Sequence, residues 1–202
     1  FENGRNLGYP VASWETPQRR AKKCRALVAF FDLRGFTRWS ASGVDAGQIQ
    51  DVVVQLELSF QDAFSGKWCE KLFAKSTGDG FMVVSEEGWD ASGGIPSASG
   101  FQHGHVMKFC RACALTVENA GNRLPAALAV GCGITTGEIT QLYVLGRLDY
   151  TGPAVNEASK IQAVAYDELC ISPQVMEHLQ ADGVVVNGKL LPEKGVRIAV
   201  EN

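Results

Sequence analysis

The strongest constraint on the fold is a pair of apolar, strand-like runs joined by a short turn that contains glycine. The runs KLFAKS (71–76) and GFMVVS (80–85) flank the turn TGDG at 77–80. Two such runs around such a turn predict a β-hairpin. The apolar run ALVAFF at 26–31, which Asp32 follows directly, predicts a further, buried strand.

Segments with helical periodicity lie on either side of the hairpin. Between 44 and 64 the apolar residues Ile49, Val52, Leu56 and Phe60 recur every three or four positions, which predicts an amphipathic helix. A second long helix is predicted at 103–120, and strands are predicted at 127–135 and 137–146.

This order of elements predicts the fold class. Strand, helix, hairpin, helix and strand form an α+β, ferredoxin-like split βαββαβ core with one antiparallel sheet and helices on one face. A helix at 153–165 and the strands and helix after it predict an appended C-terminal strand–helix–strand unit. Residues 1–25 are polar and contain a basic cluster, so we expect an N-terminal arm or linker, with the domain at 26–202.

Composition bounds the function. A length of 202 residues with 46% hydrophobic content suits one globular domain. The net charge of −3 gives no electrostatic basis for binding nucleic acid, and no apolar run is long enough to span a membrane. The six cysteines are scattered through apolar segments rather than spaced as a disulfide framework. We therefore expect a cytoplasmic protein with reduced thiols.

Asp32 and Asp79 are the most informative polar residues. Each lies at the end of a predicted strand or in a turn, with glycine nearby. Carboxylates in such places can hold Mg²⁺ against a nucleotide phosphate chain. Aspartate and glycine are also common in turns for purely local reasons, and this remains the alternative for either turn alone.

Several motifs, in order, resemble those of class III nucleotide cyclases, the family of adenylate and guanylate cyclase catalytic domains. FFDLRGFTRWS resembles F-x-D-[IL]-x-G-F-T, and KSTGDGFMVV resembles K-x-x-G-D-x-[FY]-M. GITTGEI resembles the G-I-x-[TS]-G strand, and DYTGPAVNEASKI resembles D-x-x-G-x-x-V-N-x-A-[SA]-R-[ILM]. ELCISPQVMEHL and PEKGVRIAV resemble the closing segments. The matches cover residues 26–200, and their order is far more specific than any single motif.

The resemblance implies an enzyme that converts a nucleoside triphosphate to a 3′,5′-cyclic nucleotide second messenger and pyrophosphate. Two Mg²⁺ or Mn²⁺ ions would assist the attack of the ribose 3′-oxygen. Their implied ligands are the carboxylates of Asp32 and Asp79 and the carbonyl of Leu33. The turn that begins at Arg34 opens a helix, so its N–H groups can bind phosphates. The residues of this phosphate-binding set are Arg34, Gly35, Phe36, Thr37 and Lys194.

The resemblance also implies a homodimer with two sites at its interface. The remaining site residues come from the partner subunit in this family. Lys75 and Asp149 would recognise the base, Asn156 would position the ribose, and Lys160 would stabilise the transition state.

The sequence departs from the family pattern in three places. Lys160 replaces an arginine, and lysine lacks the bidentate fork of arginine. Gly131 occupies a place where some members carry an arginine. The hairpin between Gly137 and Asp149 is shorter than is common. A domain that binds nucleotide and catalyses weakly therefore remains an alternative.

The sequence does not decide between adenine and a pyrimidine as the base of the substrate nucleotide. A lysine donor beside an aspartate acceptor resembles the adenylate cyclase pattern, which puts ATP slightly ahead. The same pair also suits cytosine and uracil, and small bacterial cyclases that make cyclic CMP or cyclic UMP in antiphage signalling belong to the same family. A pyrimidine cyclase of that kind is therefore the alternative, with GTP behind both.

Overall fold

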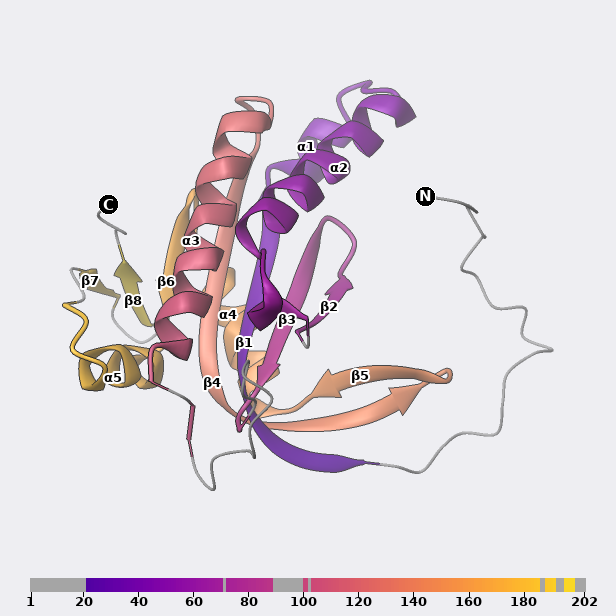
Figure 1. Cartoon of the computed structure of the whole chain (residues 1–202). Helices are drawn as coiled ribbons and strands as arrows, with labels where there is room; N and C mark the ends of the chain where they lie inside the picture. The colour runs from indigo at the N-terminus through magenta and orange to yellow at the C-terminus, as the bar shows by residue number, and fades with distance from the viewer. Residues whose placement is uncertain are drawn as a thin grey trace.

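Strand β1 (Lys22–Arg34) is the centre of the sheet. It pairs in antiparallel fashion with β3 (Gly80–Glu86) on one side and with β4 (Ala129–Val144) on the other. The computed structural model describes residues 21–70, 72–88, 100–101, 103–185, 188–191 and 195–198. In this part of the chain eight strands form one sheet, in the order β2-β3-β1-β4-β6-β8-β7, with β5 paired to β4 (Figure 1).

The predicted βαββαβ core is confirmed. After β1 come the short helix α1 (Phe36–Ser40) and the long helix α2 (Ala46–Ala63), then a turn of 3₁₀ helix (Lys67–Cys69). The hairpin of β2 (Phe73–Ser76) and β3 leads to α3 (His105–Arg123) and then to β4. β3 lies between β1 and β2 and is antiparallel to both, which is the split arrangement.

Local sequence explains where α2 begins. Asp45 is the N-cap, and its carboxylate accepts a hydrogen bond from the Gln48 N–H. The Gln48 side chain accepts one from the Asp45 N–H, which completes a capping box. Val52 and Leu56 are buried at helical spacing and face the sheet.

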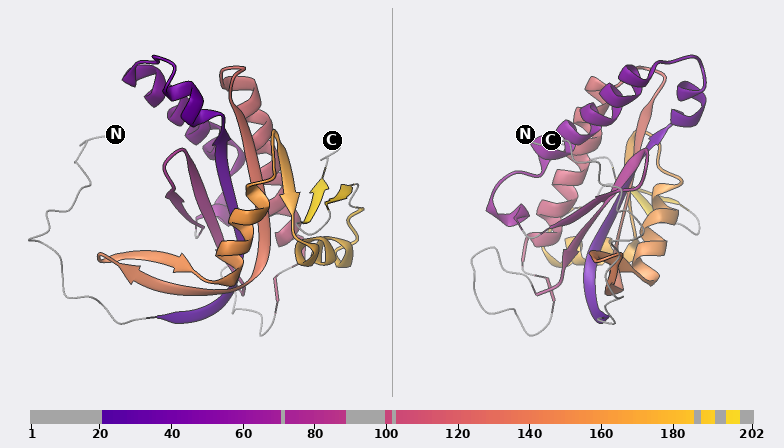
Figure 2. Two further views of the ribbon diagram at one scale, coloured as in Figure 1. Left: turned by 180° about the vertical axis from the view of Figure 1, so that it is seen from behind. Right: turned by 90° about the vertical axis from the view of Figure 1, so that its right-hand side faces the viewer.

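Alternating residues of β1 face two separate apolar clusters. Leu27, Ala29 and Phe31 pack in the larger cluster together with residues of α2 and α3. Ala26 and Val28 point to the opposite face and pack with residues of β3, β5 and α4. Figure 2 shows α2 and α3 on one side of the sheet and α4 on the other.

The core helices α2 and α3 share one face of the sheet, as predicted, and helix α4 (Pro153–Gln162), which follows the core, lies on the opposite face. Apolar periodicity gives the buried side of a helix but not the face of the sheet that it covers. β1 begins at Lys22, so the last residues expected in the arm, 22–25, belong to the first strand. Residues 1–20 lie outside the described part of the chain.

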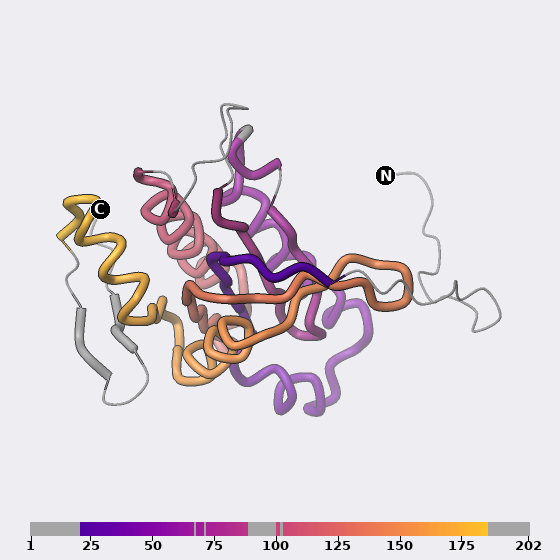
Figure 3. The backbone as a smooth tube through the Cα atoms, turned by 90° about the horizontal axis from the view of Figure 1, so that it is seen from below, coloured from indigo at the N-terminus to yellow at the C-terminus, as the bar shows by residue number. Residues whose placement is uncertain are grey.

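The extra length of β1 comes from pairing with the β4–β5 hairpin. Lys22 and Lys23 lie opposite Gln141 and Thr140 of β4, and Figure 3 shows the start of β1 running beside the hairpin. β5 (Arg147–Thr151) follows β4 through a two-residue turn. Leu145 and Gly146 have φ of 51° and 76° in this turn, as a tight hairpin with right-handed twist requires.

The appended C-terminal unit extends the sheet beyond β4. β6 (Glu168–Ile171) pairs with β4 in parallel, and α5 (Pro173–Ala181) follows with Ser172 as N-cap and Pro173 at its first position. β8 (Gly195–Ile198) pairs with β6, and β7 (Gly188–Leu191) pairs with β8. Among the described helices, none combines the length and apolar character that crossing a bilayer requires.

Helix α4 lies in direct backbone contact with β4 at Gly133. A Cβ atom at this position would be 2.1 Å from the Gln162 nitrogen and 2.6 Å from the Ala158 carbonyl oxygen. Both are main-chain atoms of α4, so no rotamer change could make room. The first glycine of GITTG is therefore a packing requirement that sets the distance between α4 and the sheet.

We expect Gly133→Ala to lower the free energy of unfolding by at least about 1–3 kcal/mol, because α4 must move away from β4. The matched control is Gly121→Ala in α3, where an added Cβ meets no heavy atom within 4 Å. The free energy of unfolding of that variant should rise by about 0.5–1 kcal/mol, because alanine has a higher helix propensity than glycine. Urea unfolding of both variants measures the difference, and equal stabilities would contradict the packing role of Gly133.

Candidate active site

The end of β1 and the turn before β3 bring Asp32 and Asp79 together. Asp32 lies opposite Gly80 in the β1–β3 register, and the Leu33 N–H donates to the Asp79 carbonyl at 3.1 Å. A Cβ atom at Gly80 would lie 2.0 Å from the Phe31 carbonyl oxygen. Glycine at this position is therefore what lets the Asp79 turn lie against β1.

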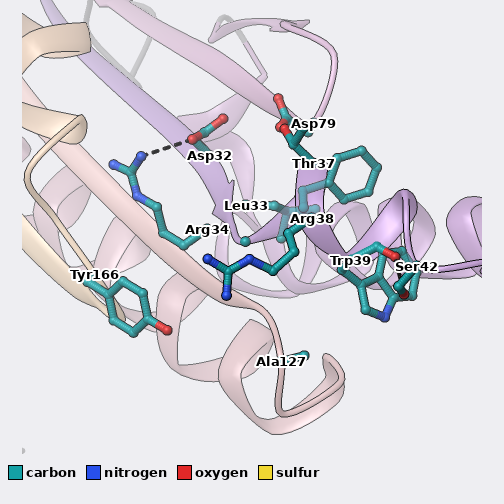
Figure 4. Close-up of a pocket in the computed structure, with 12 residues that line it drawn as sticks. Asp32, Leu33, Arg34, Thr37, Arg38, Trp39, Ser42, Asp79, Ala127 and Tyr166 are labelled. Carbon is teal, nitrogen blue, oxygen red and sulfur yellow. Dashed lines mark hydrogen bonds and ion pairs between the residues drawn. The ribbon is translucent and has the colours of Figure 1, made fainter.

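Both carboxylates line one open cavity of about 810 Å³. Figure 4 shows the side chains of Asp32 and Asp79 at its upper rim, with Arg34 and Arg38 below them. The wall of the cavity is formed by the end of β1, by α1, and by single residues of more distant segments. Its lining residues are Asp32, Leu33, Arg34, Gly35, Phe36, Thr37, Arg38, Trp39, Ser42, Asp79, Ala127 and Tyr166.

The backbone between β1 and α1 is shaped by Gly35. Gly35 has φ of 82°, and a Cβ there would lie 2.9 Å from the Ala127 carbonyl oxygen, so only glycine fits. In a strand the N–H and C=O of one residue point to the same side. The Leu33 carbonyl therefore faces the Asp79 turn, as the Leu33 N–H does.

Electrostatics at Asp32 reflect two opposing sets of neighbours. Burial raises the pKa of the Asp32 carboxyl above its usual value, and the charge of Asp79 raises that pKa further. The Arg34 guanidinium, 3.2 Å from Asp32 Oδ2, and the Gln162 side-chain amide lower the same pKa in part. The ionised pair is thus an unfavourable arrangement for a chain without a cation between the two carboxylates.

The donor set fits divalent cations that also contact a ligand. In the described residues no group of three or more His, Cys, Asp and Glu side chains is placed to hold a metal ion alone. Two carboxylates and a carbonyl oxygen in an open cavity are instead typical of Mg²⁺ or Mn²⁺ bound partly by substrate phosphates and water. Asp32, Asp79 and the Leu33 carbonyl are the residues that could hold such ions.

Lys75 and Asp149 form a second polar cluster. The Lys75 ammonium donates to both oxygens of Asp149, at 2.6 and 2.7 Å, and the Tyr150 N–H donates to the same carboxylate at 2.7 Å. β2 supplies the lysine and β5 supplies the aspartate. The shorter hairpin therefore still brings Asp149 to Lys75, and the pair presents a donor beside an acceptor.

Asn156 and Lys160 lie four residues apart on α4, so they share one face of the helix. Both side chains are exposed. None of Lys75, Asp149, Asn156 and Lys160 is among the described residues that line the cavity of Asp32 and Asp79. In one chain these four residues thus lie outside the cavity of Asp32 and Asp79, although Lys75 lines a second cavity, of about 310 Å³, together with Asp79. Lys194, predicted for phosphate binding, falls outside the described residues.

Five residues that line the cavity, Arg38, Trp39, Ser42, Ala127 and Tyr166, and the buried Gln162 beside Asp32 lie outside the predicted set. Gln162 at the end of α4 is 6% exposed and acts on Asp32, while Arg38 and Tyr166 line the cavity with exposed side chains. Gln162 lies two positions after Lys160 in the helix that carries the N-x-A-S-K motif, which is the one signal that could have drawn attention to it. Tyr166 lies in the loop after that helix, and no motif or periodic pattern in the sequence marks it as a site residue.

Residues 20–193 match the family model of the adenylate and guanylate cyclase catalytic domain. Among curated proteins, none matches the sequence significantly. Similar solved structures include the monomeric guanylyl cyclase domain of the RhoGC fusion protein from the aquatic fungus Blastocladiella emersonii. It is 18% identical with a TM-score of 0.67, and the alignment covers 88% of this chain and 96% of that one.

Two further structures extend the comparison. A dimeric form of the same fungal domain is 18% identical with a TM-score of 0.64, covering 88% of this chain and 93% of that one. The adenylyl cyclase CyaB from P. aeruginosa is 20% identical with a TM-score of 0.60, covering 89% of this chain and 94% of that one. At these identities the structural likeness shows a shared fold.

We expect Asp32→Asn to stabilise the metal-free chain. The pKa of Asp32 is raised in the folded state, so the folded chain holds its proton more tightly than the unfolded chain does. This contribution to stability is present in acid and is lost as pH rises through the folded-state pKa. At pH 7 in EDTA the melting temperature of the variant should be higher by about 2 °C.

The same measurement at about pH 4, where more of Asp32 is protonated, should show a smaller difference. Asp79→Asn removes the same repulsion, so the double variant should gain less than the sum of the two single gains. A lower melting temperature for Asp32→Asn at pH 7 would contradict this account, because the ion pair with Arg34 would then outweigh the repulsion.

Proposed function

Because this chain belongs to the family of adenylate and guanylate cyclase catalytic domains, and is therefore a nucleotide cyclase, we propose that it makes a 3′,5′-cyclic nucleotide and pyrophosphate by in-line attack of the ribose 3′-oxygen on the α-phosphorus. The observation that carries the proposal is the meeting of Asp32, Asp79 and the Leu33 backbone in one open cavity.

The carboxylates of Asp32 and Asp79 and the Leu33 carbonyl would hold two Mg²⁺ or Mn²⁺ ions. Bound there, the ions would lower the pKa of the 3′-hydroxyl and neutralise charge on the triphosphate. The raised pKa of Asp32 supports this assignment, because a cation between the two carboxylates would relieve their repulsion. The backbone of Arg34, Gly35, Phe36 and Thr37 borders the same cavity and would contact the phosphates, with Lys194 as a further phosphate ligand.

The remaining roles would come from a second copy of the chain. Lys75 and Asp149 would recognise the base edge, Asn156 would position the ribose, and Lys160 would neutralise charge that develops at the reacting phosphorus. We propose a homodimer with two sites at its interface. The absence of these four residues from the lining of the cavity, among the residues that the structure describes, supports this arrangement.

The pairing of Lys75 with Asp149 bears on the base. Their contact leaves an ammonium donor beside a carboxylate acceptor, which complements N1 and the amino group of adenine. It equally complements N3 and the amino group of cytosine, or O4 and N3–H of uracil. We put ATP first, from the likeness to the adenylate cyclase pattern, and a pyrimidine triphosphate second.

The deciding experiment incubates the purified chain separately with ATP, GTP, CTP and UTP, each with Mn²⁺. We expect cyclic nucleotide and pyrophosphate from one of them, and ATP is the predicted substrate. Asp32→Ala and Asp79→Ala should each lower turnover by at least about a thousandfold while the folded state is retained.

The matched control is Asp62→Ala, which removes an aspartate of α2 whose side chain is 54% exposed and pairs with Arg123. This variant should keep its turnover. Full activity of Asp32→Ala or Asp79→Ala would refute the metal assignment. Binding of all four nucleotides without any product would replace the proposal by its alternative, a regulatory domain that holds nucleotide.

A further inference from the structure

We propose that Arg34 is a positioning residue, whose guanidinium ties the Asp32 carboxylate to the C-terminal end of α4 in space that Gly131 leaves open. The proposal rests on the proposed function, since it takes Asp32 as a metal ligand. It gives the Arg34 side chain a structural task in addition to the phosphate contact proposed for the backbone of its turn.

All three nitrogens of the Arg34 guanidinium have a partner. Nε donates to the Ala165 carbonyl at 2.9 Å, one terminal nitrogen donates to the Gln162 carbonyl, and the other lies 3.2 Å from Asp32 Oδ2. The Gln162 carbonyl is the last one of α4, and the Ala165 carbonyl belongs to the turn that follows. Carbonyls at a helix end have no partner within the helix, and a basic side chain can bind them. The Arg34 side chain is 21% exposed, so these contacts hold the guanidinium mostly out of water.

Gly131 makes this arrangement possible. Gly131 of β4 lies opposite Asp32 of β1 in the register of the sheet. A Cβ atom at 131 would be 2.5 Å from the Ala165 carbonyl oxygen and 3.0 Å from Arg34 Nε. Any larger residue would displace both groups.

A second group from α4 approaches the same carboxylate. The Gln162 side chain is buried beside Asp32, and among the described residues its Nε2 has no partner of ordinary hydrogen-bond geometry. Asp32 is therefore contacted by a guanidinium from β1 that is itself anchored on α4, and it lies near an amide of α4. These contacts restrict the rotation of the carboxylate.

The contacts of Arg34 bear both on metal binding by Asp32 and on the position of α4. Hydrogen-bond partners behind a metal ligand fix its orientation, and their loss weakens metal affinity by about 10- to 100-fold. Helix α4 also carries Asn156 and Lys160, which the proposed function assigns to the other site of the dimer. The contacts of Arg34 thus connect a ligand of one site with the helix that serves the second.

The direction in which Arg34→Ala changes Mn²⁺ affinity distinguishes a positioning role of Arg34 from an effect of its charge alone. A positive charge beside a metal ligand opposes cation binding. If Arg34 acted only through its charge, Arg34→Ala would strengthen the binding of Mn²⁺. If Arg34 orients Asp32, the same variant weakens it.

The experiment measures Mn²⁺ binding to the full chain without nucleotide, by the electron paramagnetic resonance signal of free Mn²⁺. We expect Arg34→Ala to raise the dissociation constant about tenfold. The dissociation constant of Arg34→Lys should fall between those of the unaltered chain and Arg34→Ala, because lysine keeps the charge but lacks the planar fork whose spaced nitrogens reach both carbonyls and Asp32. The control Arg38→Ala removes the same charge from the same cavity, from a residue with an exposed side chain, and should leave Mn²⁺ affinity unchanged or higher.

Hydrogen exchange gives a readout that needs no metal. The Ala165 N–H donates to the Gln162 carbonyl at 3.0 Å, and the Val164 N–H donates to the Ile161 carbonyl at 3.2 Å. We expect these amides to exchange about tenfold faster in Arg34→Ala, and at the original rate in Arg38→Ala. Gly131→Ala breaks the same contacts from the other side, so its effect on Mn²⁺ affinity should not add to that of Arg34→Ala.

Mn²⁺ affinity in Arg34→Ala that is unchanged or higher would overturn the proposal, even if exchange at α4 becomes faster, because Arg34 would then only stabilise the helix end. Mn²⁺ binding by Asp32→Asn distinguishes a wrong role for Arg34 from a wrong metal assignment in the proposed function. If Asp32→Asn binds Mn²⁺ as tightly as the unaltered chain does, Asp32 is not the ligand, and the metal assignment itself falls.

Discussion

The contact of α4 with β4, backbone against backbone, is the constraint on which the rest of the site depends. Gly133 allows the contact by having no side chain, and Gly131 keeps space for a guanidinium at the end of the same helix. Because α4 lies this close, the Gln162 carbonyl at its end and the Ala165 carbonyl in the following turn come within reach of Arg34, and Gln162 comes to lie beside Asp32. A more distant helix would leave Asp32 without Gln162 and Arg34 without its two carbonyl partners, and it would place Asn156 and Lys160 on a different surface.

Close approach recurs on the other side of β1. Gly80 lets the Asp79 turn lie against Phe31 and Asp32, so two carboxylates meet at one end of the sheet. Their repulsion and the partial burial of Asp32 disfavour the ionised pair in the chain by itself. An arrangement that is unfavourable without a cation is suited to bind one. Gly35, Gly80 and Gly133 each belong to one of the family motifs, and each is required by close packing. These same close approaches determine where the charged groups lie.

Much of the fold could be predicted because local signals agree with the global arrangement. The hairpin at TGDG and the long helices follow from periodicity and turn residues, and the structure confirms the split βαββαβ order. The face covered by α4 could not be predicted, because it depends on glycines in β4 and not on the pattern of α4 itself. The meeting of Asp32 with Asp79, and of Lys75 with Asp149, followed from motif order. Arg34 and Gln162 as partners of Asp32 did not, since they meet only through the register of β1 with β4 and the end of α4.

The central claim is that Asp32 and Asp79 of one chain and α4 of a second chain form one cyclase site. Its most direct test is a heterodimer of an Asp79→Ala chain and a Lys160→Ala chain, purified through two different tags, since each homodimer of these variants should be inactive. One of the two interface sites then contains neither substitution, so the account predicts about half of the activity of the unaltered dimer. A heterodimer as inactive as the two parent homodimers would contradict it, because every site would then lie within a single chain that carries a defect.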